Sequence, residues 1–180
     1  MHRTQPWLSA LSVFVRKAGR LFPAFLFWPG FAQPAVSVAV PGNQIVGAGF
    51  AVVSLNASGI ENNVTFTLSW NPALLRYDSD AKGAAVATYT PNRTQTASGK
   101  LSVLAAVSPD ATYPSGSHPL VTINFTAVGP SPSTTVALID GGTLTPPLAR
   151  RRVFDTQGNN LTAAIFSAAT ISVGLASAAP

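Results

Sequence analysis

Hydrophobic and polar residues alternate strictly along the segment from Val64 to Trp70. Every second residue there is apolar, and the residues between are threonine or serine. This period of two is typical of a β-strand with one buried face and one face in water. Asn71-Pro72 ends the pattern, because proline has no N–H to donate to a β-ladder. A second apolar run, Leu74 to Tyr77, follows at once, so the segment predicts two strands joined by a tight corner.

Short apolar runs recur along the chain with glycine, proline, asparagine or serine between them. About ten such runs at this spacing are typical of all-β sandwiches and barrels. No segment shows a 3.6-residue apolar stripe with helix caps, so we expect little helix, and 163–169 is the one segment where a helix competes. The expected strands are 36–40, 49–55, 64–70, 74–77, 84–89, 101–107, 120–128, 134–139, 153–154 and 170–173.

The composition suits one folded domain with additional segments. The chain has 180 residues, of which 47% are hydrophobic and 9% charged, and it contains no cysteine. Low charge with many apolar residues argues against a disordered polar chain. Without cysteine there is no disulfide framework and no thiolate metal site, so the fold must be held by packing.

The net charge of +5 comes mostly from the first twenty residues, which carry four of the 11 lysines and arginines. The residues after 32 carry seven basic and six acidic side chains. Nucleic-acid binding needs a basic surface on the folded part, so this balance argues against a nucleic-acid partner.

The first 32 residues have the order of a secretory signal peptide. A basic stretch at 16–20 precedes a twelve-residue apolar run, Leu21 to Ala32, which ends with the small residues Gly30 and Ala32. The run is shorter than the ~20 residues of a membrane span. We expect a signal peptide at 1–32, a folded domain at 33–173 and a linker or disordered end at 174–180. The protein would then be secreted or held at the cell surface, with no membrane span after cleavage; a retained anchor is the alternative.

Four segments resemble motifs of cohesin-like domains. Residues 70–77 (Trp-Asn-Pro-Ala-Leu-Leu-Arg-Tyr) resemble the corner where an aromatic residue, Asp or Asn, and proline precede the next strand, and 99–105 resemble the strand that follows. Residues 120–127 are similar to the strand Leu-Ala-Thr-Ile-x-Phe-x-Val, and 154–161 to a late Asp-x-x-Gly-Asn hairpin. The motifs occur in the family's order between residues 36 and 173.

The resemblance implies an all-β fold, an antiparallel β-sandwich of jelly-roll topology with about nine strands. It also implies an exported, non-catalytic module without a cofactor. Cohesins bind dockerin modules through one sheet face, so a dockerin-like protein partner or a structural surface role is expected. No motif for dockerin contact is matched in this sequence.

A carbohydrate-binding module on the same architecture is the alternative function. Sugar rings stack on exposed aromatic side chains. Tyr89 and Tyr113 lie beside prolines and are the candidates for exposure, whereas Trp70 has the phase of a core residue. Exposed rings in a flat row would favour a polysaccharide ligand, and a flat polar sheet face with buried rings would favour a protein partner.

Arg150, Arg151 and Arg152 form the one concentrated charge after the leader. Such residues on an edge strand discourage pairing with other chains. The alternative role is contact with an acidic protein or an anionic polysaccharide.

The acidic and histidine residues give little support for catalysis. The closest carboxylates, Asp78 and Asp80, are expected on an exposed turn, where solvation is favoured over a calcium site or a glycosidase pair. An enzyme of that class would instead need a pair such as Asp78 and Asp110 to meet in a cleft. His118 is expected in a solvated loop, and it has no second histidine after the leader with which to build a zinc site or a triad.

Overall fold

A computed structural model describes residues 36–42, 44–129, 131–141 and 149–174. The expected signal peptide and most of the expected C-terminal linker lie outside these residues. Within them, no helix is long and apolar enough to cross a membrane.

The described residues form twelve strands and one short 3₁₀ helix, and nine of the strands are longer than three residues. They are β1 (Ser37–Ala39), β2 (Gln44–Val46), β3 (Ala48–Ala57), β4 (Glu61–Ser69), β5 (Leu75–Lys82), β6 (Thr88–Asn92), η1 (Thr96–Ser98), β7 (Lys100–Ala106), β8 (Gly116–Ala127), β9 (Ser131–Ile139), β10 (Arg152–Asp155), β11 (Ile165–Ser167) and β12 (Ala169–Gly174).

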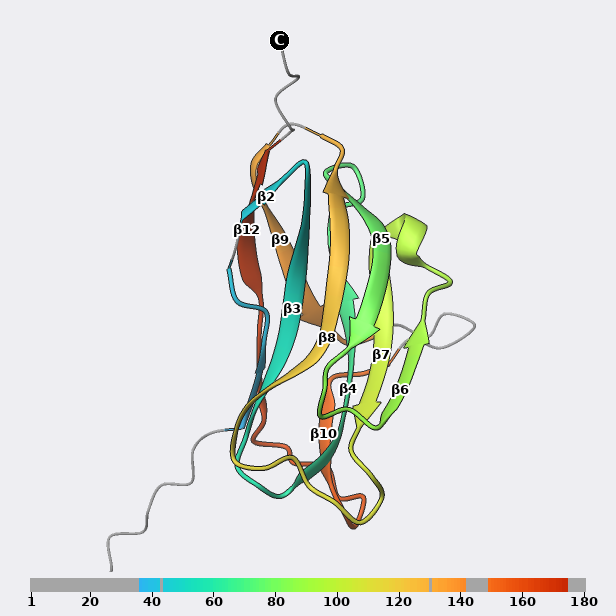
Figure 1. Cartoon of the computed structure of the whole chain (residues 1–180), viewed down its shortest axis with the longest axis vertical. Coiled ribbons are helices and arrows are strands. Elements are labelled where there is room, and N and C mark those ends of the chain that lie inside the picture. Colours follow the sequence, from blue (N-terminus) through green and yellow to red (C-terminus); the bar gives the residue numbers. More distant parts are fainter. Residues whose placement is uncertain (1–35, 43, 130, 142–148, 175–180) are drawn as a thin grey trace, which may run out of the picture. The chain divides into compact units, whose positions relative to one another are not determined.

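The strands build two layers, which Figure 1 shows with β5, β8 and β3 side by side in one of them. In this first layer β5 pairs with β8, and β8 pairs with β3. In the second layer β4 pairs with β7, and β7 pairs with β6, while β9 and β10 lie along the other edge of β4. Strand β9 also pairs with β12, which joins the layers along one side.

Most pairs are antiparallel, and the exceptions among the described strands are β1 with β11 and β2 with β12. The predicted all-β sandwich is therefore confirmed, and the number of longer strands equals the expected nine.

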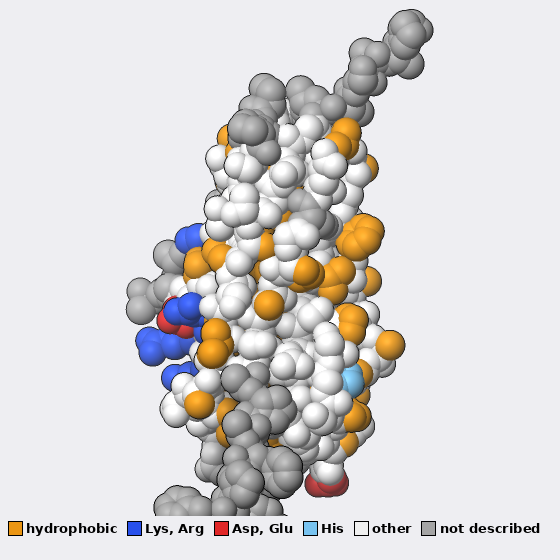
Figure 2. Space-filling view, turned by 90° about the vertical axis from the view of Figure 1, so that its left-hand side faces the viewer, with side chains coloured by type: hydrophobic (Ala, Val, Ile, Leu, Met, Phe, Trp, Pro, Cys, Tyr) orange, Lys and Arg blue, Asp and Glu red, His pale blue; other side chains and the backbone are white. Residues whose placement is uncertain are grey.

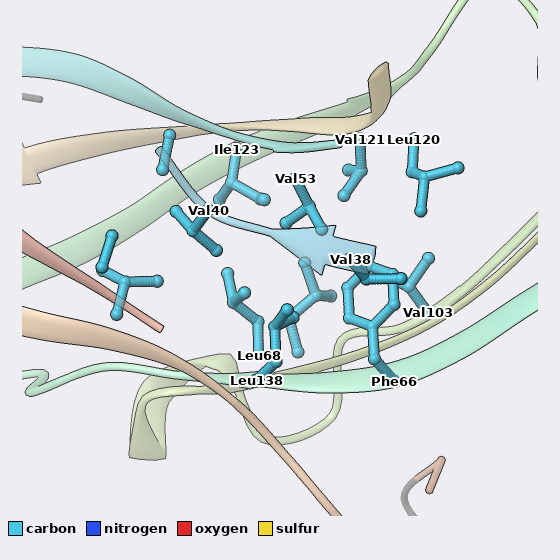
Figure 3. Close-up of a cluster of buried hydrophobic side chains, with 14 of the residues drawn as sticks. Val38, Val40, Val53, Phe66, Leu68, Val103, Leu120, Val121, Ile123 and Leu138 are labelled. Carbon is cyan, nitrogen blue, oxygen red and sulfur yellow. The ribbon is translucent and has the colours of Figure 1, made fainter. Parts of the chain in front are cut away.

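The core lies between the layers and is made by every second residue of the strands. Phe66 and Leu68 of β4 meet Val53 of β3 and Ile123 of β8, and all four are 0% exposed. Figure 3 shows these side chains pointing toward one another from opposite layers. Burial of each such side chain contributes about 1.5–3 kcal/mol, so this alternation is what holds the layers together.

The Asn-Pro corner carries the chain from the second layer to the first. Strand β4 ends at Ser69 and β5 begins at Leu75. Between them, the Asn71 carbonyl accepts hydrogen bonds from the N–H groups of Leu74 (3.1 Å) and Leu75 (3.0 Å). The Asn71 side chain accepts another from the N–H of Ala73 at 3.0 Å. The predicted corner is confirmed.

Trp70 at this corner is 5% exposed, as the phase of its strand predicted. Its indole stacks on Tyr77 with ring centroids 6.3 Å apart and meets the edge of Phe125 at 5.2 Å. Gly99 lies against the same residue with φ of 74°, and a Cβ there would come within 2.2 Å of the Trp70 carbonyl oxygen. Only glycine fits this approach of the 3₁₀ helix to the corner.

The structure decides one alternative that the sequence left open and corrects one predicted strand. The segment 163–169 contains β11 and the start of β12 rather than a helix, since its backbone pairs with other strands. The expected strand 84–89 begins only at Thr88, because residues before it form a turn in which the Val86 N–H donates to the Gly83 carbonyl.

Candidate interaction surface

The outer face of β5, β8 and β3, here called the β5–β8–β3 face, presents residues in rows across three paired strands. Outward and inward side chains alternate along each strand, so the register decides which outward residues are neighbours. One row contains Ser79, Asn124 and Phe50, and the next contains Arg76, Thr126 and Ala48.

Polar side chains on this face are bonded to one another. Asp78 accepts a hydrogen bond from the Thr126 hydroxyl at 2.6 Å and pairs with the Arg76 Nε at 3.1 Å. The Asn124 amide donates to the Ser79 hydroxyl at 2.8 Å. The bond from Thr126 lowers the pKa of Asp78 more than its slight burial raises it, and Arg76 adds to the lowering. The polar part of the face is therefore pre-arranged.

Apolar side chains gather at one end of the same face. Val46 ends β2 and lies opposite Ala48 of β3, while Val128 directly follows β8, where the N–H of Ala127 donates to the Gly47 carbonyl at 2.6 Å. Val46, Val128 and Phe50 are 48%, 44% and 54% exposed, and they are three of the five large apolar residues in the described part of the chain with such exposure. We call Val46, Phe50 and Val128 the apolar end of the β5–β8–β3 face.

A β-bulge separates Asp78 from Asp80. Tyr77 lies opposite Phe125 and Ser79 lies opposite Asn124, so Asp78 is the extra residue on β5. A bulge shifts the alternation by one residue. Consequently Asp78 faces outward while Tyr77 and Asp80 both face inward.

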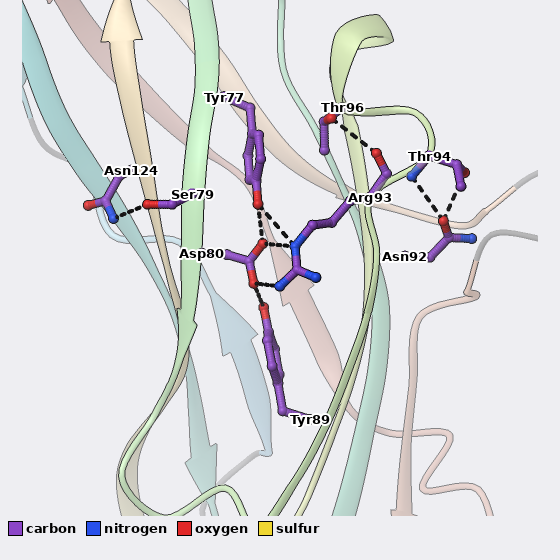
Figure 4. Close-up of polar contacts among 9 residues, drawn as sticks. All are labelled: Tyr77, Ser79, Asp80, Tyr89, Asn92, Arg93, Thr94, Thr96 and Asn124. Atoms are coloured by element: carbon purple, nitrogen blue, oxygen red, sulfur yellow. Dashed lines mark hydrogen bonds and ion pairs between the residues drawn. The ribbon is translucent and has the colours of Figure 1, made fainter.

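Asp80 is the centre of a buried polar cluster at the edges of the two layers. Its side chain is 0% exposed. The Arg93 guanidinium donates to both carboxylate oxygens, at 2.7 and 2.8 Å. The hydroxyls of Tyr77 and Tyr89 donate to the same carboxylate, Tyr89 at 2.5 Å. Figure 4 shows Asp80 between the two tyrosines with Arg93 beside it.

This cluster, which we call the Asp80 cluster, ties the layers together. Tyr77 and Asp80 belong to β5 at the edge of the first layer, whereas Tyr89 belongs to β6 in the second and Arg93 directly follows it. A carboxylate has about four lone-pair sites, and four donated bonds occupy them. Asp80 therefore has no acceptor capacity left for a cation or a substrate.

The titration of these groups follows from their contacts. Burial raises the pKa of Asp80, but the hydrogen bonds from Arg93, Tyr77 and Tyr89 outweigh burial and hold it below its ordinary value. Burial and the neighbouring carboxylate raise the pKa values of Tyr77 and Tyr89. The cluster is an ionised carboxylate held by neutral phenols and a guanidinium.

The expectation that Asp78 and Asp80 share an exposed turn is wrong, because both lie within β5 and the bulge turns Asp80 inward. Within the described residues, no three or more histidines, aspartates and glutamates gather as a metal site would require.

Tyr89 and Tyr113 do not form an exposed aromatic platform. Tyr89 is half-buried on β6, with its hydroxyl on Asp80. The expectation that Tyr113 is exposed is wrong, since it is 0% exposed. The Asn62 amide reaches three carbonyls within 108–111 at 2.8 to 3.2 Å, and the Tyr113 N–H donates to the Glu61 carbonyl at 2.7 Å. These bonds fold the loop back and bury the ring.

His118 lies on β8 rather than in a loop. Its Nε2 is 2.7 Å from the Pro114 carbonyl oxygen, and its ring is 5.7 Å from that of Tyr113. The histidine ring therefore packs beside the ring of the buried Tyr113.

Arg150, Arg151 and Arg152 are all exposed, as a contact residue must be, but they have different neighbours. The Arg151 guanidinium is 3.3 Å from an Asp140 carboxylate oxygen and lies over the ring of Phe166 at 5.9 Å. Figure 2 shows basic side chains gathered at one edge of a face that is otherwise mostly uncharged.

Arg151 and Arg152 line an open pocket of about 300 Å³, which Arg150 does not line. We call it the β10 pocket. Its walls are Asp140, Arg151, Arg152, Asn160, Leu161, Thr162, Ala164 and Phe166.

Comparison of the fold with solved structures identifies its architecture. A cohesin of Acetivibrio cellulolyticus scaffoldin B, solved in complex with a dockerin, matches with a TM-score of 0.61 at 18% identity, covering 78% of this chain and 99% of that one. The chain has a cohesin-like fold.

Cohesins from other settings match equally well. A non-cellulosomal cohesin of the archaeon Archaeoglobus fulgidus has a TM-score of 0.59 at 14% identity, over 80% of this chain and 93% of that one. The cohesin module of a family 33 glycoside hydrolase of Clostridium perfringens has a TM-score of 0.60 at 12% identity, over 78% and 98%. No family model and no curated protein sequence matches the chain. The likeness is therefore one of fold.

Proposed function

We propose that this cohesin-like domain is a non-catalytic interaction module that binds a partner protein through the β5–β8–β3 face. The observation that carries the proposal is the pairing of a pre-bonded polar surface with the apolar end made by Val46, Phe50 and Val128. Protein interfaces combine an apolar centre with a polar rim, and contiguous exposed apolar groups mark interaction sites.

The solved neighbours support a protein partner. Two cohesins with this fold, from Acetivibrio cellulolyticus and Clostridium thermocellum, were solved in complex with dockerins. We extend this to the proposal that the partner is a dockerin-like module. The contacts would be made by residues of this chain's own face.

The arrangement of aromatic rings favours a protein over a polysaccharide on this face. Trp70 and Tyr113 are buried, and the hydroxyls of Tyr77 and Tyr89 are bonded to Asp80. Within the described residues, Phe50 is the one aromatic side chain among the exposed large apolar groups. A single ring does not make the flat row on which a glycan chain stacks.

We further propose that the domain acts outside the cell, secreted or at its surface, after removal of residues 1–32. The support is the basic, apolar and small-residue order of the leader. Residues 33–173 would then be the working domain.

The test is binding to a purified partner. The full chain is used to capture secreted proteins of its host, each captured protein is purified, and affinity is measured by calorimetry. We expect Phe50→Asp and Val128→Asp each to weaken binding more than tenfold, since a charge in the apolar centre of an interface is desolvated without a partner.

Ile165→Asp is the matched control, because Ile165 is equally exposed, at 53%, and lies on β11, two strands from β3 and level with Asn56, at the end of β3 far from Phe50. It should leave the affinity within twofold. Equal loss in all three variants, or no loss in the first two, would overturn the proposed face.

A further inference from the structure

The β10 pocket has the size and the unpaired polar groups of a ligand site. Its volume of about 300 Å³ lies at the lower end of the range for small-molecule pockets, roughly 300–1,000 Å³. None of its lining residues belongs to β5, β8 or β3. A ligand here would therefore not use the β5–β8–β3 face.

The backbone holds the pocket walls in place. Arg152 begins β10, whose backbone pairs with β4 through Thr65. The chain then turns at Asp155, whose carboxylate accepts bonds from the N–H groups of Gln157 (2.9 Å) and Asn159 (2.8 Å). The turn brings Asn160 opposite Phe154, and this side of the pocket therefore lies beside β10.

The Arg151 side chain at the edge of the pocket is already paired with Asp140. Asp140 accepts from the Arg151 backbone N–H at 2.8 Å and from its guanidinium at 3.3 Å, and Phe166 lies under the same guanidinium. These contacts fix Arg151 as a wall of the pocket, and the hydrogen bonds from Arg151 lower the pKa of Asp140, so Asp140 is an ionised acceptor.

The guanidinium of Arg152 is exposed, and no hydrogen bond or ion pair is formed by it within the described residues. The side chains of Asn160 and Thr162 likewise have no partner there. A guanidinium binds a carboxylate with two parallel hydrogen bonds. An amide and a hydroxyl can each donate and accept.

Together these groups match a ligand with one carboxylate and several hydroxyls. Arg152 would donate hydrogen bonds to the carboxylate. Asn160 and Thr162 would donate to hydroxyls or accept from them, and Asp140 would accept from a hydroxyl. The apolar lining of Leu161 and Phe166 suits the C–H face of a sugar ring. An acidic peptide supplies carboxylates but few hydroxyl groups for Asn160 and Thr162, and a phosphate group carries more negative charge beside Asp140 than a carboxylate does.

We propose that the β10 pocket binds a uronic acid unit of an anionic polysaccharide. Arg152 recognises the carboxylate, and the pocket lies apart from the protein-binding face. The domain would thereby be held on an acidic glycan while its β5–β8–β3 face stays available to a partner protein.

The test measures binding of the full chain to trigalacturonate by calorimetry, with cellotriose as the neutral sugar and oligoglutamate as the acidic peptide. We expect saturable binding of trigalacturonate, at least tenfold tighter than of either other probe. Arg152→Gln should weaken that binding at least tenfold.

Arg150→Gln is the matched control, because it removes the same charge from a neighbouring exposed residue that does not line the pocket. It should leave the affinity within twofold, and thermal unfolding of both variants should match the parent. Equal loss in both variants would show non-specific charge attraction and overturn the site. Tighter binding of oligoglutamate, or no binding of trigalacturonate, would overturn the sugar assignment, and neither result bears on the β5–β8–β3 face.

Discussion

Two aspartate–arginine pairs in this domain have the same chemistry and opposite consequences. Asp80 and Arg93 lie 2.7 Å apart, and the Asp80 side chain is 0% exposed. Asp140 and Arg151 lie 3.3 Å apart, with their side chains 55% and 38% exposed. The first pair has two tyrosine hydroxyls as further partners, whereas the second borders an open pocket.

The difference shows what decides the role of a charge. A buried carboxylate must have its hydrogen-bonding sites occupied, because leaving them empty costs free energy of desolvation. Once they are occupied, the group stabilises the fold and has nothing left to offer a ligand. An exposed pair is screened by water and contributes little to stability, so its surroundings remain available for recognition.

Removal of the Asp80 carboxylate should have the largest effect. Asp80→Ala leaves Arg93 and two tyrosine hydroxyls without their acceptor, and we expect the free energy of unfolding to fall by about 2–3 kcal/mol. Urea unfolding followed by tryptophan fluorescence measures this. Asp78→Ala on the outer side of the same strand is the control and should cost less than about 1 kcal/mol. Equal costs would contradict a special role for the buried carboxylate.

Acid should produce a smaller loss through the same group. The pKa of Asp80 is lower in the folded state, so its contribution is complete above the ordinary aspartate pKa of about 3.9 and is lost as the pH falls through the folded value. We expect the unfolding free energy to fall below about pH 4 less steeply in Asp80→Asn than in the parent. The same slope in both proteins would show that other carboxylates account for the acid sensitivity.

Removal of the exposed pair should have the smallest effect. Asp140→Ala is expected to change the unfolding free energy by no more than about 0.5 kcal/mol, because exposed ion pairs are screened. Thermal and urea unfolding of this variant beside Asp80→Ala test the contrast directly. A loss above about 1 kcal/mol would show that the β10 pocket is a structural element of the fold.

The strand pattern predicted much of the architecture because burial follows a simple period. Phe66, Leu68 and Trp70 are buried as their alternation indicated, and Asn71-Pro72 forms the corner. The predicted strand 74–77 was too short, since β5 continues to Lys82, and the bulge at Asp78 turns Asp80 inward instead of leaving both aspartates on an exposed turn. One extra residue in a strand changes the facing of all later side chains, and local sequence does not reveal it.

The candidate sites were less predictable than the fold. Tyr113 has the local sequence of an exposed loop residue, and only the bonds of Asn62 to the loop carbonyls show that it is folded inward. The apolar end was missed, because Val46, Phe50 and Val128 look like core residues in their own strands. They become a surface only through strand pairing, which leaves Val46 beside Ala48 at the end of β3 and leaves Phe50 and Val128 exposed.

By itself the sequence determined that this chain is an all-β sandwich with a cohesin-like order of motifs, since alternation and turn residues act over a few neighbouring positions. Only the tertiary structure decided which charged side chains have their hydrogen-bonding sites occupied within the fold and which remain available to a ligand. Asp80 meets Tyr89 and Arg93 only because β5 and β6 lie at adjoining edges, and Arg152 lines one pocket with Asn160 and Thr162 only because the chain turns back at Asp155. Such contacts depend on strand pairing and on a bulge, which are settled by packing of the whole domain rather than by any one segment.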